Sequence, residues 1–370
     1  STLAGTSRCI FSYQSDRKSR RGCSPRLLAT RFEPAASTNM TGAQKTKRFF
    51  AFGAFAALAA IAAAPLAGCG RTSEATGSFS KNFTVSGPVR LELTTGSGDA
   101  RITAGNPGEV AVSGEINVHE RNEQEAQQRV RAAEASPPII VQGNTIRVGG
   151  AASGNYDVDF TIVVPPHTEI HGLTGSGDVT IDGVQGPVDF ISGSGDISAS
   201  NVAGDVRATS GSGAVQFANI QGRAEIASGS GDATASKVKG ETRIRTGSGD
   251  VHADHAGDDL DVQTSSGDVV VEIAAADLRV RTSSGNVTIT GSPSASHFWD
   301  FHTTSGDVTL NVSSSASFRL YAHSSGDGDI DAAIPIVMEG TSAKHELRAR
   351  IGDGAARVEI GTVSGDISLH

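Results

Sequence analysis

Apolar and polar residues alternate in short runs along the second half of the chain, and these runs recur at a fixed spacing. Two kinds of nine-residue unit follow one another, as in residues 177–185 (GDVTIDGVQ) and 186–194 (GPVDFISGS). In both kinds the third and fifth positions are apolar and the fourth is usually polar. Alternation with a period of two residues predicts short strands with one buried face. One unit of each kind would then form a coil of 18 residues with two strands and two turns.

Glycine marks the start of nearly every unit. Steps of nine residues from Gly177 to Gly285 meet glycine at eleven of thirteen positions, and the exceptions are Asp258 and Ala276. Because glycine tolerates positive φ angles and close backbone approach, it suits the tight turns of stacked coils. We therefore predict an all-β fold in which residues 171–370 form a parallel β-solenoid, a β-helix or β-roll with 18-residue coils.

The repeat loosens toward the end of the chain. Insertions interrupt the spacing around residues 292–300 and 318–321, and residues 330–354 break it further. Residues 363–367 (VSGDI) then supply one last copy. We therefore expect coils of unequal length in this part.

Residues 79–170 are predicted to form a small N-terminal region with one helix. An early copy of the turn, TGSGD, occupies residues 95–99, and residues 122–135 are rich in Glu, Gln, Arg and Ala, as a helix would be. Strand-like runs cover residues 89–94, 110–118, 145–148 and 156–164. A stacked fold exposes an open edge at its first coil, so we expect this helix to cap the N-terminal end of the solenoid.

The first 78 residues have a different character. Residues 1–39 show no hydrophobic period and are predicted to be an upstream or disordered segment. From Met40, basic residues precede an apolar run over residues 49–66, which is the layout of a secretory signal. The run ends in Leu66, Ala67, Gly68 and Cys69, which resemble the lipobox of bacterial lipoproteins.

That resemblance implies that residues 40–68 are a lipoprotein signal peptide. Leu66, Ala67 and Gly68 would be recognised by the signal peptidase, Cys69 would be lipidated, and residues 69–78 would form a tether. An uncleaved membrane helix is the alternative, since 18 apolar residues lie at the edge of spanning length. Both interpretations place the rest of the chain outside the cytoplasm, and Gly70, in place of Asp after the cysteine, favours the outer membrane.

Charge and cysteine content narrow the classes of function. The net charge is −9, but residues 1–68 carry ten basic and two acidic side chains, which leaves 21 basic and 38 acidic ones for residues 69–370. Nucleic-acid binding needs clustered positive charge, so this balance argues against it. If Cys69 is lipidated, the exported part has no cysteine left for a disulfide, and its stability must come from stacking. No cofactor is predicted.

The repeated Ser-Gly-[Asp/Asn]-Val units resemble a known family. Together with residues 160–165 (FTIVVP), which lead into residues 173–178 (LTGSGD), and the closing residues 354–367, they are similar to a bacterial β-strand-repeat domain of unknown function labelled "putative adhesin". The similarity covers about residues 79–370. It implies an adhesin-like β-solenoid that, with the lipobox at residues 66–69, would be a lipoprotein binding a protein or glycan at the surface, and the family has no assigned catalytic residues.

Aspartates that follow the turn glycine are the first candidate site. Stacked coils would place these carboxylates about 4.8 Å apart, where two of them repel by roughly 1 kcal/mol in water. We predict an exposed row whose carboxylates accept hydrogen bonds from turn N–H groups and Ser hydroxyls, interrupted at Ala214 and Asn286. A calcium-stabilised binding module is the alternative. Its candidate ligands are Asp178, Asp196, Asp232, Asp250 and Asp268.

Known calcium-binding nonapeptide rolls place the aspartate two residues after glycine. Here the aspartate follows glycine directly, which favours the hydrogen-bonding interpretation. His252, Asp254 and His255 form a possible small metal-binding cluster, but they are predicted to be solvated surface residues. Residues 297–302 (HFWDFH) could form a carbohydrate-stacking platform, but the register places Trp299 and Phe301 at inward positions, so core packing is favoured.

These observations predict a non-enzymatic protein. The predicted loops are short and the acidic residues form a row, whereas an enzyme needs a cleft with coupled titratable groups. A carbohydrate-active β-helix enzyme is the alternative from another class. We expect a cell-envelope protein, held to the membrane by its N-terminal lipid at the outer membrane or at an extracellular or periplasmic face, that binds or scaffolds.

Overall fold

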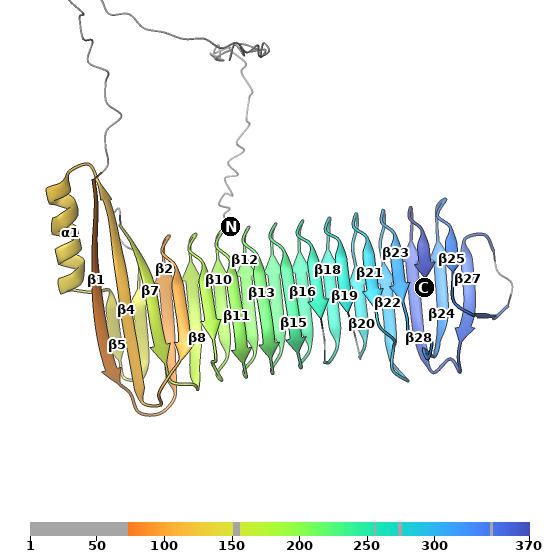
Figure 1. Cartoon of the computed structure of the whole chain (residues 1–370), viewed down its shortest axis with the longest axis horizontal. Helices are drawn as coiled ribbons and strands as arrows, with labels where there is room; N and C mark the ends of the chain where they lie inside the picture. Colours follow the sequence, from red (N-terminus) through yellow and green to blue (C-terminus); the bar gives the residue numbers. More distant parts are fainter. Residues whose placement is uncertain (1–72, 151–155, 255–256, 273–275, 341–342) are drawn as a thin grey trace, which may run out of the picture. The chain divides into compact units, whose positions relative to one another are not determined.

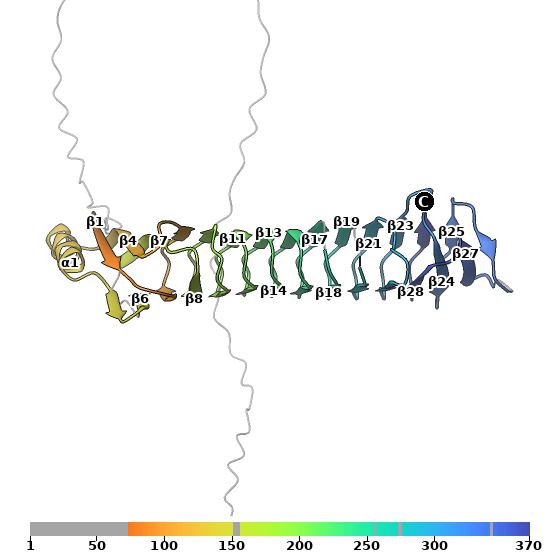
Figure 2. The same ribbon diagram turned by 90° about the horizontal axis from the view of Figure 1, so that it is seen from below.

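The computed structural model describes residues 73–150, 156–254, 257–272, 276–340 and 343–370. In these residues the strands form two long sheets that face each other (Figures 1 and 2). The first sheet has 14 strands in the order β1 (Ser73–Thr84), β4 (Glu109–Glu120), β7 (Tyr156–Val164), β3 (Ala100–Ala104), β9 (Val179–Asp182), β11 (Ile197–Val202), β13 (Val215–Ile220), β15 (Ala233–Val238), β17 (Val251–Asp254), β19 (Val269–Glu272), β21 (Val287–Thr290), β23 (Val308–Asn311), β29 (Ile367–Leu369) and β25 (Ile330–Ala332).

The second sheet has 15 strands, which come from the alternate strands of each coil. Their order is β26 (Val337–Met338), β27 (Glu346–Ile351), β24 (Phe318–Ser324), β28 (Ala356–Thr362), β22 (Phe298–His302), β20 (Leu278–Arg281), β18 (Leu260–Thr264), β16 (Thr242–Thr246), β14 (Ala224–Ser228), β12 (Val206–Ser210), β10 (Val188–Ser192), β8 (Thr168–Thr174), β2 (Val89–Thr95), β6 (Thr145–Gly149) and β5 (Ile139–Gln142).

Each regular coil gives one strand to each sheet and pairs in parallel with the coil before and after it. Val188 pairs with Val206 in the second sheet, and Ile197 pairs with Val215 in the first. Partners are therefore 18 residues apart, which confirms the predicted parallel β-solenoid with 18-residue coils.

The core is a thin layer between the two sheets. The third and fifth positions of each unit are buried, as Val188 and Phe190 show. Trp299 and Phe301 are also fully buried, with ring centroids 6.0 Å apart, and Trp299 Nε1 donates to the carbonyl of Ala276 at 2.9 Å. The core interpretation of these two aromatic residues is confirmed.

A row of buried hydroxyl groups follows the ends of the second-sheet strands, where Ser or Thr recurs in every coil. Thr246 donates to the carbonyl of Gly231 in the preceding coil at 3.3 Å and accepts the N–H of Gly249 in its own turn at 3.0 Å. A Cβ at Gly231 would collide with the carbonyl of Gly213, so this turn position requires glycine. Together the hydroxyl and the glycine let successive turns stack directly on one another.

The single helix in the described residues is α1 (Glu123–Ala135), which agrees with the predicted helical stretch. Asn122 caps it by accepting the N–H of Gln124 at 2.9 Å. Its buried residues Ala126, Val130 and Ala133 pack at the N-terminal end of the first sheet, where α1 contacts β1 and β4 (Figure 1).

The tether predicted for residues 69–78 is too long. Residues 73–78 form the first half of β1, which pairs antiparallel with β4, from Ser73 opposite Glu120 to Thr84 opposite Glu109. Most side chains of β1 are exposed or half-buried, so its sequence lacks the apolar alternation that marks the other strands.

Strands at both ends of the stack are interleaved out of chain order. At the C-terminal end β28 lies between β22 and β24, and β29 lies between β23 and β25. At the N-terminal end the coil formed by β2 and β3 lies between the strands β6 and β7 and the strands β8 and β9. The repeat copy that ends the chain is therefore not the last coil of the stack.

No helix in the described part of the chain is both long and apolar enough to cross a membrane. The apolar run over residues 49–66, together with Leu66, Ala67, Gly68 and Cys69, lies outside the described residues.

Candidate functional site

Basic and acidic side chains alternate along the middle of the outward face of the second sheet. Each strand contributes the residue that lies between its two inward side chains, and the strand pairing places these residues side by side. The row, called here the charge ladder, consists of Arg147, Glu92, His171, Asp189, Arg207, Glu225, Arg243, Asp261, Arg279 and Asp300.

Ion pairs connect neighbouring coils along the charge ladder. Arg147 Nε lies 2.6 Å from Glu92 Oε2, and its hydrogen bond lowers the pKa of Glu92. Further along, Arg207 Nη1 lies 3.6 Å from Glu225 Oε2. Exposed pairs of this kind contribute little to stability, because water screens them. Their order also specifies the pairing, because skipping one coil would bring like charges such as Arg207 and Arg243 together.

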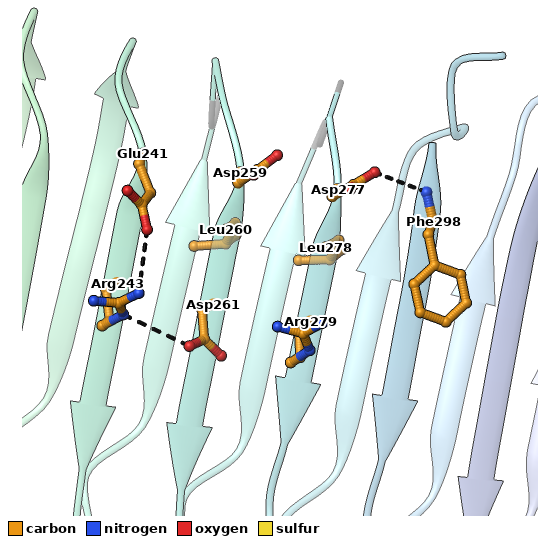
Figure 3. Close-up of a pocket in the computed structure, with 9 residues that line it drawn as sticks. All are labelled: Glu241, Arg243, Asp259, Leu260, Asp261, Asp277, Leu278, Arg279 and Phe298. Atoms are coloured by element: carbon orange, nitrogen blue, oxygen red, sulfur yellow. Dashed lines mark hydrogen bonds and ion pairs between the residues drawn. The ribbon is translucent and has the colours of Figure 1, made fainter. Parts of the chain in front are cut away.

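A shallow hollow of about 160 Å³ lies beside the charge ladder, at the start of β16, β18, β20 and β22 (Figure 3). The coil turns place Glu241, Asp259 and Asp277 in a row along it, and Phe298 lies at one end. The ladder contributes Arg243, Asp261 and Arg279. We call this recess the acidic hollow, because four carboxylates face two guanidinium groups.

The acidic hollow is only partly neutralised. Arg243 lies between two carboxylates, with Nη2 3.2 Å from Glu241 and Nε 3.7 Å from Asp261. The carboxylate of Asp259 is exposed and makes no hydrogen bond or ion pair with any residue that the structure describes. Negative charge is therefore available in the hollow for a positively charged group.

Asp277 accepts the backbone N–H of Phe298 at 2.8 Å and lies 3.1 Å from His297 Nδ1. The N–H of Phe298, and to a lesser extent His297, lower the pKa of Asp277. A carboxyl group with a lowered pKa is a poor proton donor near neutral pH. This geometry is suited to holding a positive charge.

The aspartates of the predicted row form an inter-coil chain of hydrogen bonds, called here the aspartate rail. Asp178 Oδ1 accepts the N–H of Asp196 at 2.9 Å, and Asp250 Oδ1 accepts that of Asp268 at the same distance. The carboxylates thus accept turn N–H groups, but each donor belongs to the next coil. Asn286 does not interrupt the rail, because its side-chain oxygen accepts the N–H of Asp307 at 3.0 Å. Ala214 does interrupt it, since it has no acceptor.

The candidate calcium ligands lie on this rail in two groups, Asp178 with Asp196, and Asp232 with Asp250 and Asp268. Within the described residues, no three or more His, Cys, Asp or Glu side chains are grouped so that they could hold a metal ion. The calcium hypothesis stays a prediction, which calorimetry with calcium chloride and with EDTA would test. A site on the rail requires a higher Tm with calcium than with EDTA.

Two substitutions of one rail aspartate should distinguish the contribution of its hydrogen bond to stability from that of its negative charge. Asp196 Oδ1 accepts the N–H of Ala214 at 2.7 Å. We expect Asp196→Ala to lower the free energy of unfolding by about 0.5–1.5 kcal/mol, the usual contribution of one hydrogen bond. Asp196→Asn should retain most of that stability, as Asn286 does in its own coil. Urea unfolding of both variants would measure this, and equal losses would contradict the assigned role.

A second inter-coil chain of polar groups was not predicted. Asp182 Oδ1 accepts Ser200 Oγ at 2.6 Å and Asn201 Nδ2 at 2.7 Å, and Asn201 Oδ1 accepts Asn219 Nδ2 at 2.7 Å. Asn201 and Asn219 have positive φ angles, 54° and 58°, which asparagine tolerates better than most residues. The sequence signal that could have predicted this chain is the pair of asparagines one coil, or 18 residues, apart.

Asp182 should make stability depend on pH. Hydrogen bonds from Ser200, and then from Asn201, lower its pKa from 3.8. A lowered folded-state pKa gives stability that is complete well above 3.8 and is lost as the pH falls through the folded value. We expect Asp182→Asn to flatten the decline of Tm below about pH 4. Thermal unfolding at a series of acidic pH values would measure it, and an unchanged slope would contradict the prediction.

The remaining predicted group of ionisable residues is only partly described. His252 is exposed on β17, as predicted for a fourth position, and Asp254 ends the same strand. His255 lies outside the described residues, as do the predicted lipidation residue Cys69 and its recognition residues Leu66, Ala67 and Gly68.

Comparison with known proteins identifies the repeat. The family model described as Toastrack DUF4097 matches residues 90–298 and, in a second match, residues 276–370. No curated protein matches the chain.

Three solved structures are similar at low identity. A "putative cell adhesion protein" from Clostridium sporogenes ATCC 15579 is 15% identical, covering 81% of this chain and 99% of its own, with a TM-score of 0.19. A "putative adhesin" from Bacteroides fragilis NCTC 9343 is 13% identical over 80% and 97%, with a TM-score of 0.32. A "putative lipid binding protein" from Parabacteroides distasonis ATCC 8503 is 14% identical over 79% and 96%, with a TM-score of 0.31.

Proposed function

The chain belongs to the Toastrack DUF4097 family, and on this basis we propose that it is a non-enzymatic binding module of the cell envelope. A lipid on Cys69 would hold it at the outer membrane or at an extracellular or periplasmic face. The outward face of the second sheet would meet a ligand at that surface.

The acidic hollow carries the binding proposal. It combines the uncompensated carboxylate of Asp259 with the aromatic ring of Phe298 on an otherwise regular sheet face. A cationic side chain of a protein ligand would fit this combination, because the carboxylates would attract its charge, while the ring of Phe298, which already contacts Arg357, would pack against its apolar stem. The charge ladder beside the hollow would supply a polar rim, as the edge of a protein interface does.

Sequence spacing supports an anchored position for the solenoid. Only residues 70–72 lie between Cys69 and the start of β1 at Ser73. A lipid on Cys69 would therefore keep the first sheet close to the membrane surface. One acyl chain binds membranes only weakly and reversibly, so stable anchoring would need the several chains that bacterial lipoproteins carry.

Site-specific photocrosslinking in intact cells would test the binding proposal. A photoreactive amino acid at Asp259 in the acidic hollow is expected to crosslink to an envelope component. The same amino acid at Thr180, on the outward face of the first sheet, is the matched control and should give no such product. Equal crosslinking at both positions, or none at Asp259, would refute binding at this face.

Mass spectrometry of the membrane fraction would test the anchor. We expect the mature N-terminal peptide to begin at a Cys69 that carries lipid, and Cys69→Ser to move the protein out of the membrane fraction. An unmodified Cys69 in membrane-bound protein would overturn the lipoprotein assignment while leaving the crosslinking result intact.

A further inference from the structure

A second hollow, of about 570 Å³, lies at the opposite end of the same second-sheet strands. Four adjacent strands contribute outward side chains to it, namely Arg245, Gln263, Arg281 and His302. The turns that follow add the hydroxyl groups of Ser265, Ser283 and Thr304. We call this recess the arginine hollow.

The strand positions that line the arginine hollow include no acidic residue, although the exported part of the chain is acidic. The Arg245 side chain is 47% exposed, and its ion pair with Glu225 is long, at 3.8 Å. Across the turn from Arg281, the aspartate rail carries the neutral Asn286 instead of an aspartate. The local balance of charge therefore favours an anion.

Two of the lining side chains are held in place by a buried carboxylate. Asp300, whose side chain is 9% exposed, lies 2.8 Å from Arg281 Nη2 and 2.8 Å from His302 Nε2. An arginine has five N–H donors in a rigid fork, so Arg281 keeps donors for a ligand after this pairing. Fixing it in advance reduces the entropy lost when a ligand binds.

The turns change sequence in the same coils that carry these residues. Coils before the hollow have Gly-Ser-Gly, as at residues 247–249, whereas the next three have Ser-Ser-Gly, Ser-Ser-Gly and Thr-Ser-Gly at residues 265–267, 283–285 and 304–306. The extra hydroxyls, of Ser265, Ser283 and Thr304, are exposed and make no side-chain hydrogen bond with the described residues. These hydroxyl groups thus occur beside the fixed guanidinium group of Arg281 and the exposed one of Arg245.

We propose that the arginine hollow binds an anionic saccharide. Arg245 and Arg281 lie two coils apart, or about 10 Å at the spacing of adjacent strands, and would each bind a carboxylate, sulfate or phosphate group on the sugar. Gln263 and the turn hydroxyls can both donate and accept hydrogen bonds, which matches the hydroxyl groups of a sugar. Single-stranded nucleic acid is disfavoured, because its binding relies on rows of stacking aromatic residues.

This assignment deepens the proposed binding function and rests on it, since it names a ligand class for the same sheet. It uses the other end of the strands, however, so the two can be tested apart. Crosslinking at Asp259 that persists without saccharide binding would remove this assignment alone.

Isothermal titration calorimetry of the full chain in detergent micelles would test the assignment at low ionic strength. The probes are trigalacturonic acid, its fully methyl-esterified form, a heparin tetrasaccharide, inorganic phosphate and a single-stranded oligonucleotide. We expect at least one of the two anionic sugars to bind, and the neutral ester not to bind. No binding of either anionic sugar, or equal binding of the ester, would overturn the proposal. Phosphate or oligonucleotide binding as tight as the best sugar would also overturn it.

Variants would place the binding in the hollow. Arg245→Gln should weaken sugar binding by about tenfold or more, and the double variant Ser283→Ala with Thr304→Val should weaken it less. Arg281 is left intact, because its removal would leave Asp300 with fewer partners in a buried position. Arg101→Gln, an equal change of charge on the exposed face of β3, is the matched control. Equal weakening by Arg101→Gln, at unchanged Tm in both variants, would show non-specific attraction and refute the site.

Discussion

Deleting residues 356–370 should detach the chain from residue 313 onward from the rest of the solenoid. Within the described residues, β24 pairs only with β27 and β28 in the second sheet, and β25 pairs only with β29 in the first. The deletion removes both β28 and β29, and with them the fully buried side chains of Val358, Ile360, Ile367 and Leu369. Each such side chain contributes about 1.5–3 kcal/mol by its burial, so the loss at this end would be large.

Limited proteolysis would measure the effect of the deletion. Cleavage is expected within residues 313–355, while the coils before β22 stay resistant. Val358→Asn, which places a polar group at an inward position, should have a milder form of the same effect. Glu359→Gln, which changes the adjacent outward side chain, is the matched control and should leave the resistance unchanged. Resistance that is unchanged by the deletion would mean that β24 re-pairs directly with β22 and would contradict the prediction.

Trp299→Ala should be among the most destabilising single substitutions. The indole is fully buried, packs against Phe301 and donates a hydrogen bond to Ala276, all in a core only one layer thick. Replacing a buried tryptophan with alanine usually costs about 3–5 kcal/mol, because the cavity that remains collapses only partly. Urea unfolding followed by circular dichroism would measure the loss.

Phe298→Ala is the control from the adjacent position. Its ring is half-buried on the outward face and lies 5.3 Å from the guanidinium carbon of Arg357, a contact of about 0.5–1 kcal/mol. A loss for Trp299→Ala no larger than that for Phe298→Ala would contradict the assigned inward position of Trp299.

The periodicity predicts which face of the sheets the residues of the coils occupy. Counting from the turn glycines placed Trp299 and Phe301 inside and His252 outside, as the structure has them. The charge ladder was also within reach, because Asp189, Arg207 and Glu225 follow at steps of one coil. These residues form ion pairs only if consecutive coils pair directly with each other, and the 18-residue repeat already implied that pairing.

The order of strands within a sheet could not be predicted where insertions interrupt the nine-residue spacing. The repeat motif in residues 363–367 identifies an inward and an outward face, but nothing in it specifies a place between β23 and β25. Similarly, β1 is paired along its whole length although it has almost no buried side chains, so its sequence resembles a linker. In both cases the partner strand determines the structure, and the local sequence does not.

The interleaved C-terminal strands also bear on the order in which the protein acquires its structure. Contacts between central coils join residues 18 apart, so these coils can form as soon as two consecutive coils of chain have been synthesised. The C-terminal end instead needs contacts over 56 and 59 residues, from Thr362 to Gly306 and from Asp366 to Asp307. Long-range contacts of this kind form late. Synthesis of residues 356–370 is therefore the step that completes this part of the fold, and a chain whose synthesis stops before them presents an open, protease-sensitive end.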